Sequence, residues 1–171
     1  SAEGISVTGR SLGEATITVT SERGLTQDIA VRVFDPLALM TDGLLIRYVD
    51  EFTKIWDDSG SNADDDGCYW KPVAPDGYHP LGSLGGHGWA NPNGNMAAIV
   101  VQELGDGDAL AHPTDYELIW DDSGSGAYAN GSFWLPVAPE GYVACGVVAT
   151  LGWSKPSTEE VVCVRADLVA N

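Results

Sequence analysis

The sequence predicts an all-β protein, and three observations lead to this fold class. The 171 residues include 21 glycines and 9 prolines, a composition that favours many turns. Apolar residues alternate with polar ones over short stretches, as half-buried strands require, and long helical periodicities do not occur. The chain also repeats itself: Trp120 follows Trp56 by 64 residues, inside two copies of the string "IWDDSGS". We therefore expect two tandem four-stranded units with pseudo-twofold symmetry that form a β-sandwich or a β-prism, preceded by a β-hairpin.

The hairpin is predicted within residues 1–36. Apolar Ile17 and Val19 alternate with threonines, a glycine-containing turn follows, and Val31 and Val33 alternate in the next stretch. Such alternation predicts two strands with one buried face. The stretch "GISVTGRSLGEATITVTSERGLTQDIAVRVF" resembles the end of a bacterial immunoglobulin-like domain of group two. The resemblance implies that residues 1–36 are the C-terminal part of such a domain in a longer parent chain. The alternative is a hairpin that belongs to the following domain.

Residues 37–171 follow a junction, "DPLALMTDG", and contain the repeat. The 64-residue offset holds without a gap up to Leu104 and Leu168, so the units span about 44–107 (the first repeat) and 108–171 (the second repeat). In the second repeat, strands are predicted at "YELIW", "GSFWLPV", "GYVACGVVAT" and "EVVCVRADLV". The stretches "APDGY" and "APEGY" predict turns, because proline fixes φ and glycine supplies a positive φ. Closure of the eight strands would hide the sheet edges.

The second repeat resembles a known family at "IWDDSGSGAYANGSFWLPVAPEGYVACGVVATLGWSKPSTEEVVCVRADLV". These residues are similar to the vacuolar protein sorting-associated domain of the sixty-two type, and the similarity extends over about residues 40–171. The first repeat departs from the pattern, because "AAIVVQEL" replaces the ending that contains Cys163 and Arg165. The resemblance implies an all-β binding module and no catalysis. Similar Trp-x-Pro repeats occur in the adaptor-binding region of large vacuolar sorting proteins.

The formal net charge of −17 excludes several partners. A surface this acidic repels nucleic-acid phosphates and anionic lipid headgroups. The chain also has no apolar run of roughly 18 residues, so direct membrane insertion is not expected. Cations and basic protein surfaces are the natural complement, and solubility is the plainer reason for the charge.

The repeated string "IWDDSGS" has two interpretations. Asp, Ser and Gly form tight turns in which the side chains cap their own backbone. Carboxylates in such a turn also suit Ca²⁺, which makes Ca²⁺ a candidate cofactor. The loop that follows this string is more acidic in the first repeat. In the second repeat, no further acidic residue follows the string within this loop. The candidate metal ligands are Asp57, Asp58, Asp64, Asp65, Asp66, Asp121 and Asp122.

The tryptophans divide into two groups. Trp56, Trp70, Trp120 and Trp134 lie among apolar strand residues and are expected in the core. Trp89 and Trp153 lie in "GHGWANPNG" and "TLGWSKPS", which are loop sequences, at equivalent places in the two repeats. A ring held on a loop can stack on a sugar, and the alternative is a lid over the end of the core. Hydrogen bonds to sugar hydroxyls are expected from Asn91, Asn93, Ser154 and Lys155.

The three cysteines show no metal-binding spacing. Cys145 and Cys163 have the apolar counterparts Leu81 and Ile99 in the first repeat, which predicts interior positions. A disulfide between them would leave Cys68 free, and buried free thiols are the alternative. The sequence contains no His-Glu-x-x-His motif and no phosphate-binding glycine loop, so we expect no enzyme.

These observations favour an extracellular binding module of a larger bacterial surface or secreted protein. Immunoglobulin-like stalk domains of the same parent chain would present it away from the cell, and an acidic domain with tryptophan-bearing loops suits a glycan ligand in adhesion. The alternative is a peptide- or protein-binding module that uses the paired Trp-x-Pro strands. A hydrolase is the third hypothesis, and it would require turnover.

Overall fold

The computed structural model describes residues 13–33, 36–41, 43–105 and 107–169. The chain divides into two compact units, Ser1–Ala38 and Leu39–Asn171. The described parts contain no helix that is long and apolar enough to cross a membrane.

The smaller unit contains the predicted hairpin, formed by β1 (Gly13–Thr20) and β2 (Thr26–Val33). The two strands pair in antiparallel register, with Ile17 opposite Ile29. The tight connection between them includes Gly24, whose φ of +76° suits glycine. The expected buried face is not formed by the described side chains of this hairpin: Ile17 and Val19 are half-buried and Ile29 is exposed. A two-stranded sheet has too little surface to bury one face by itself. The immunoglobulin-like assignment of residues 1–36 stays a prediction.

The larger unit is built from short antiparallel strands and two single-turn 3₁₀ helices. Before and within the first repeat, the strands are β3 (Leu39–Thr41), β4 (Leu44–Val49), β5 (Phe52–Asp57), β6 (Gly67–Pro72), β7 (His79–Pro80), β8 (Leu84–His87) and β9 (Ala98–Glu103). In the second repeat they are β10 (Leu110–Ala111), β11 (Asp115–Asp121), β12 (Gly131–Val137), β13 (Tyr142–Val143), β14 (Val148–Leu151) and β15 (Cys163–Arg165), with the 3₁₀ helices Thr158–Glu160 and Ala166–Leu168.

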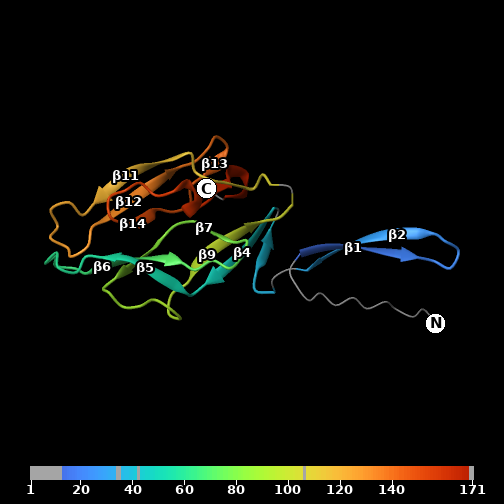
Figure 1. The fold of residues 1–171 in the computed structure, drawn as a ribbon, viewed down its shortest axis with the longest axis horizontal. Coiled ribbons are helices and arrows are strands. Elements are labelled where there is room, and N and C mark those ends of the chain that lie inside the picture. Colours follow the sequence, from blue (N-terminus) through green and yellow to red (C-terminus); the bar gives the residue numbers. More distant parts are fainter. Residues whose placement is uncertain (1–12, 34–35, 42, 106, 170–171) are drawn as a thin grey trace. The chain divides into compact units, whose positions relative to one another are not determined.

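Apart from β3, which precedes the first repeat, the two repeats have the same topology, which confirms the predicted all-β fold class. The first repeat forms the sheets β3-β4-β9-β7 and β5-β6-β8, and the second forms β10-β15-β13 and β11-β12-β14. Even the irregularities correspond: β5 and β11 each contain a register shift immediately before Trp56 and Trp120, respectively. In Figure 1 the first repeat (teal to green) and the second (yellow to red) form two layers, as in a β-sandwich or prism.

Hydrophobic clusters of buried residues hold these layers, and three of them consist of residues that the structure describes. Within the first repeat, Phe52, Cys68 and Trp70 pack together, and the second repeat has an equivalent cluster with Tyr116 and Trp134. A third cluster joins the repeats. It consists of Leu44, Ala109 and Val164, with Ile46, Leu81, Leu110, Leu168 and Val169 packed against it.

The predicted proline–glycine turns are present in both repeats. The backbone N–H groups of Tyr78 and Tyr142 donate to the carbonyls of Pro75 and Pro139, at 2.9 and 3.1 Å. The intervening Gly77 has a φ of +80°, as the sequence predicted.

The second repeat differs in detail from the four predicted strands. The stretch 141–150 was expected as one strand, but β13 and β14 belong to different sheets. The break lies where the two repeats cross at the equivalent Gly82 and Gly146. A Cβ at Gly146 would lie 2.7 Å from the Leu81 carbonyl oxygen, so only glycine permits this approach. The contact between the repeats therefore divides the strand.

The core assignment of the tryptophans is correct for Trp56, Trp70 and Trp134, which are buried. It is wrong for Trp120, which is 40% exposed, because the first repeat covers only part of the face on which this ring lies. The predicted disulfide is also not formed: Cys68, Cys145 and Cys163 are all free thiols. Cys163 is buried as expected. Cys145 was also expected in the interior, but it is exposed to solvent.

Candidate ligand-binding site

The repeated string forms the same turn twice. Asp57 and Asp121 each accept the backbone N–H two residues ahead through Oδ1, at 3.1 and 3.0 Å. The carbonyls of Asp58 and Asp122 then accept the N–H groups of Ser61 and Ser125, which closes a β-turn. Gly60 and Gly124 occupy the positive-φ position of each turn. The first aspartate of each pair therefore shapes the turn, as the turn interpretation predicted.

The second aspartate of each pair holds the loop tryptophan. The Trp89 indole Nε1–H donates to Asp58 Oδ1 at 2.7 Å. In the second repeat, the Trp153 indole donates to Asp122 Oδ1 at 2.6 Å. We call these the Trp–Asp pairs. Residues that the sequence assigned to two different roles, stacking and metal binding, thus belong to one arrangement that occurs twice.

Both tryptophan loops are fixed at their first residue. The backbone N–H of Gly88 donates to the Asp66 carbonyl at 2.7 Å, and Gly152 donates to the equivalent Asn130 carbonyl at 2.6 Å. The rings nevertheless remain accessible, because Trp89 is 46% exposed and Trp153 is 51% exposed. An indole whose N–H is anchored while half of its surface faces solvent is an oriented apolar platform.

The aspartate environments differ between the two repeats. Asp122 is buried, and burial alone raises the pKa of a carboxyl group. Hydrogen bonds from Trp153, from the Gly131 backbone and from Ser125 outweigh burial, so the pKa of Asp122 is lowered. Asp58 is only half-buried. The second Trp–Asp pair is therefore the more rigidly held.

The other predicted ligand-binding residues are engaged in fixing the loops. The Asn93 side-chain oxygen accepts the Phe52 N–H at 2.9 Å, and Asn91 accepts the Asn93 N–H at 3.0 Å. Lys155 forms an ion pair with Asp115 at 2.6 Å. Phe52 and Asp115 begin β5 and β11, whereas the aspartates of the Trp–Asp pairs follow the ends of these strands. Ser154 is exposed next to Trp153 and is the polar neighbour best placed beside a platform.

The Ca²⁺ site stays a prediction. Asp57 forms an ion pair with Lys54, and although burial raises the pKa of Asp57, hydrogen bonds from Lys54 and Ser59 lower it overall. Asp64, Asp65 and Asp66 are exposed, and Asp65 lies 3.8 Å from His87. Asp121 shapes its turn, as described above. Across the described ranges, no group of three or more His, Cys, Asp or Glu side chains is arranged to hold a metal ion.

Two cavities lie between the repeats and away from the Trp–Asp pairs. They have volumes of about 260 and 390 Å³, and His79 lines both. The His79 and His112 rings are 6.0 Å apart, and the same region contains Glu159 and Glu160. Neither of these two cavities includes Trp89 or Trp153.

Sequence reasoning missed a second repeated contact. The buried Trp70 indole donates to Cys68 Sγ at 3.0 Å, and the buried Trp134 indole donates to Ser132 Oγ at 2.9 Å. Cys68 and Ser132 are equivalent positions, so a thiol and a hydroxyl perform the same role. Ser132 also donates to the Gly152 carbonyl at 2.7 Å, which ties the core to the loop of Trp153. The shared offset of 64 residues was the signal that would have revealed it.

Comparisons with known proteins agree with the fold. Residues 95–171 match the Vps62 family, vacuolar protein sorting-associated protein 62, which supports a Vps62-type domain over the second repeat. A solved structure, GNIP1Aa from Chromobacterium piscinae, is similar with 32% sequence identity and a TM-score of 0.65. The similarity covers 74% of this chain and 25% of the GNIP1Aa chain, so this chain corresponds to about a quarter of that protein. No curated protein matches the chain.

Proposed function

We propose that residues 39–171 form a non-catalytic glycan-binding module with two equivalent platforms, the Trp–Asp pairs. The observation that carries this proposal is that Trp89 and Trp153 are half exposed while their indole N–H groups are held by Asp58 and Asp122. An ordinary core tryptophan is covered, as Trp70 and Trp134 are. A fixed, exposed ring provides the flat apolar surface on which the C–H face of a pyranose stacks.

The duplication supports binding rather than catalysis. Stacking of one sugar on one ring gives a weak site, and two such sites on one module add avidity for a branched or repeated glycan. The Cys68 thiol is buried and accepts the Trp70 indole N–H. Cys68 therefore has a structural role in the hydrophobic core.

Peptide binding through the Trp-x-Pro strands has less support. The tryptophans and prolines of these strands, Trp70, Pro72, Trp134 and Pro136, are buried. A peptide laid over β6 or β12 would meet the intervening Lys71 and Leu135 instead. We further propose that the module belongs to a larger extracellular protein of bacterial origin, in which the glycan is a cell-surface or host ligand.

A glycan array with the fluorescently labelled chain tests the proposal, and titration calorimetry with the best-binding oligosaccharide follows. Trp153→Ala and Trp89→Ala should each weaken array binding about tenfold or more, and the double variant should lose it. The melting temperature should change little, because both rings are half exposed. Tyr128→Ala is the matched control, since Tyr128 is a more exposed aromatic residue that belongs to neither pair.

Two outcomes for the tryptophan variants would contradict the proposal. One is array binding by the double variant at the wild-type level. The other is a large drop in melting temperature for either tryptophan variant, which would place that ring in the core as a lid. Absence of binding to any glycan on a broad array would also count against it.

A further inference from the structure

The outer edge of β11 carries backbone groups that point away from the sheet. β11 is the edge strand of the sheet β11-β12-β14 (Figure 1). Tyr116 lies opposite Pro136 of β12, which has no backbone N–H to donate, so these two residues form a non-hydrogen-bonded pair. The backbone N–H and C=O of Tyr116 therefore point away from β12. Because this direction alternates along an antiparallel strand, those of Leu118 point the same way.

The equivalent edge of the first repeat is covered by a loop. Phe52 corresponds to Tyr116 and also lies opposite a proline, so its N–H points outward as well. The Asn93 side-chain oxygen accepts this N–H at 2.9 Å. The Gly94 N–H donates to the Asp50 carbonyl at 2.9 Å, next to it. The loop thus occupies the start of the edge of β5.

The second repeat uses the equivalent loop differently. Ser157 takes the place of Asn93, but its hydroxyl accepts the Glu159 N–H and caps the 3₁₀ helix that begins there. The outward N–H of Tyr116 instead donates to the carboxylate of its neighbour Asp115, which is exposed. The loop therefore does not occupy the edge of β11.

An exposed leucine also replaces a lysine at this edge. Lys54 of β5 corresponds to Leu118, and a lysine at a sheet edge discourages pairing with another strand. Leu118 is 50% exposed, and within the described ranges its backbone forms no hydrogen bond to a segment outside the sheet. The opposite edge of the sheet is covered, because Ser83 of the first repeat donates to the Val147 carbonyl and accepts the Ala149 N–H. β11 is therefore the open edge.

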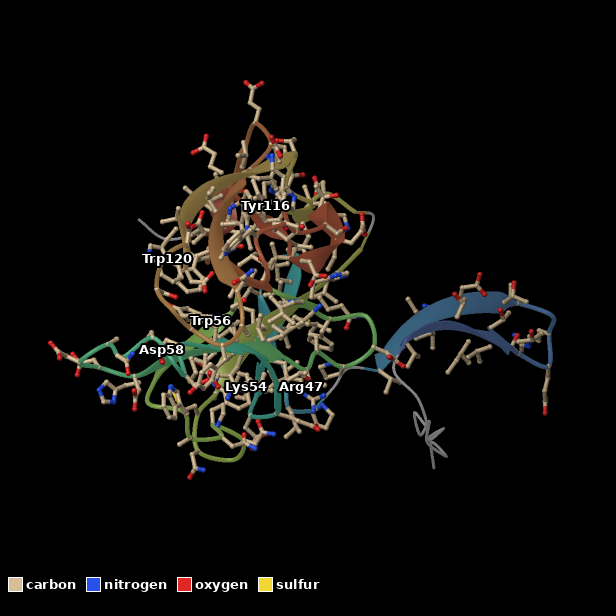
Figure 2. The ribbon with its side chains drawn as sticks, turned by 60° about the vertical axis from the view of Figure 1, so that its left-hand side comes forward. Arg47, Lys54, Trp56, Asp58, Tyr116 and Trp120 are labelled. Atoms are coloured by element: carbon tan, nitrogen blue, oxygen red, sulfur yellow. The ribbon has the colours of Figure 1, made fainter. Side chains whose placement is uncertain are left out.

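This edge is separate from the contact between the repeats. The ring of Trp120 lies 5.7 Å from that of Trp56, on the face through which the repeats meet. Tyr116 packs with Trp134 in the buried cluster of the second repeat, on the opposite face, and Leu118 lies on that face too. In Figure 2, Trp56 lies where the repeats meet, and Tyr116 lies farther from the first repeat. A strand added beside Leu118 would leave the internal contact intact.

Charge selects the kind of strand that fits. Residues opposite each other on neighbouring strands share a face, so an added strand would place one set of side chains beside Leu118 and the next beside Glu117. Glu117 is exposed, whereas the carboxylate of Asp115 is paired with Lys155. The first set is therefore apolar and the second basic. A second copy of this chain fits poorly, because each chain carries a net charge of −17.

We propose that the outer edge of β11 binds an extended peptide in which apolar residues alternate with lysine or arginine. The peptide adds an antiparallel strand to the sheet, and its backbone pairs with that of Tyr116 and Leu118. The register shift after Leu118 ends the pairing, so the contact is short and the binding weak. The site lies beside β11 rather than over the Trp-x-Pro strands, and it does not depend on glycan binding.

Fluorescence anisotropy with a short labelled peptide of alternating valine and lysine tests the proposal. The wild-type chain should bind it, more tightly at low salt. Leu118→Lys introduces the residue that the first repeat carries there and should weaken binding about tenfold or more. N-methylation of the central valines, whose N–H groups face β11, should abolish binding. N-methylation of the lysines, whose N–H groups point away, should not.

Leu151→Lys is the matched control. It makes the same exchange at an exposed leucine of the same sheet, on the covered edge strand β14, and should leave binding unchanged. Failure of the wild-type chain to bind the peptide would overturn the proposal. Wild-type affinity in Leu118→Lys, or equal binding of the two N-methylated peptides, would also do so. Sedimentation velocity without peptide covers the remaining case: self-association that Leu118→Lys abolishes would make a second copy the occupant and overturn the proposal.

Discussion

The first and second repeats share a strand arrangement and a set of hydrogen bonds, although some of the side chains that make these bonds differ. Strand register, the shift before Trp56 and Trp120, and the Trp–Asp pairs all correspond. The acceptor of the core indole is a thiol in one repeat and a hydroxyl in the other. Equivalent positions in the two repeats therefore have the same structural role. The burial and the charge of the side chain at each position differ with the segment that covers it.

The largest expected difference concerns the aspartates of the Trp–Asp pairs. Asp122→Ala removes a buried acceptor from Trp153 and from the Gly131 backbone, and should lower the free energy of unfolding by about 3 kcal/mol. Asp58→Ala removes a half-buried acceptor and should cost about 1 kcal/mol. Urea unfolding of both variants measures the difference. Equal costs would mean that the two pairs are held alike.

Acid should affect the second repeat through Asp122. The folded pKa of Asp122 is lowered, because hydrogen bonds to the carboxylate outweigh burial. Its contribution to stability is therefore complete above the unfolded pKa of about 3.9 and is lost as the pH falls through the lower folded pKa. Asp122→Asn cannot titrate and should flatten the fall in unfolding free energy below about pH 4. An unchanged pH dependence in this variant would assign the acid sensitivity to other carboxyls.

A smaller effect is expected at the core indole acceptors. Ser132→Ala leaves the Trp134 indole with Thr150 Oγ1 at 3.3 Å and should cost about 2 kcal/mol. Cys68→Ser supplies to the first repeat the hydroxyl that the second already uses, and should change the unfolding free energy by less than about 1 kcal/mol. Thermal unfolding of both variants compares them. A large loss in Cys68→Ser would show that the thiol packs in a way a hydroxyl does not.

The smallest expected effect concerns Ca²⁺ and the more acidic turn of the first repeat. Binding to the native state alone raises the melting temperature, and one weak site should raise it by about 2–4 °C between excess chelator and millimolar Ca²⁺. Asp64→Asn with Asp65→Asn should abolish the increase. The second repeat, which lacks these acids, provides the internal reference. A melting temperature that does not respond to Ca²⁺ would leave the repeated string with its turn role only.

The all-β class, the repeat and the tight turns are predictable from residue spacing and local backbone geometry alone. An ungapped 64-residue offset of Trp, Pro and Gly requires two copies of one unit, and "APDGY" specifies a turn wherever it occurs.

What covers each of two equivalent residues depends on how the whole chain packs. Trp56 and Trp120 have identical local sequences, yet one is buried and the other exposed, because each repeat meets a different neighbour. The same holds for the separate sheets of β13 and β14, for the exposed Cys145, and for the pairing of Trp89 with Asp58 across 31 residues. Burial and long-range hydrogen bonds depend on tertiary packing, so local residue propensities do not predict them.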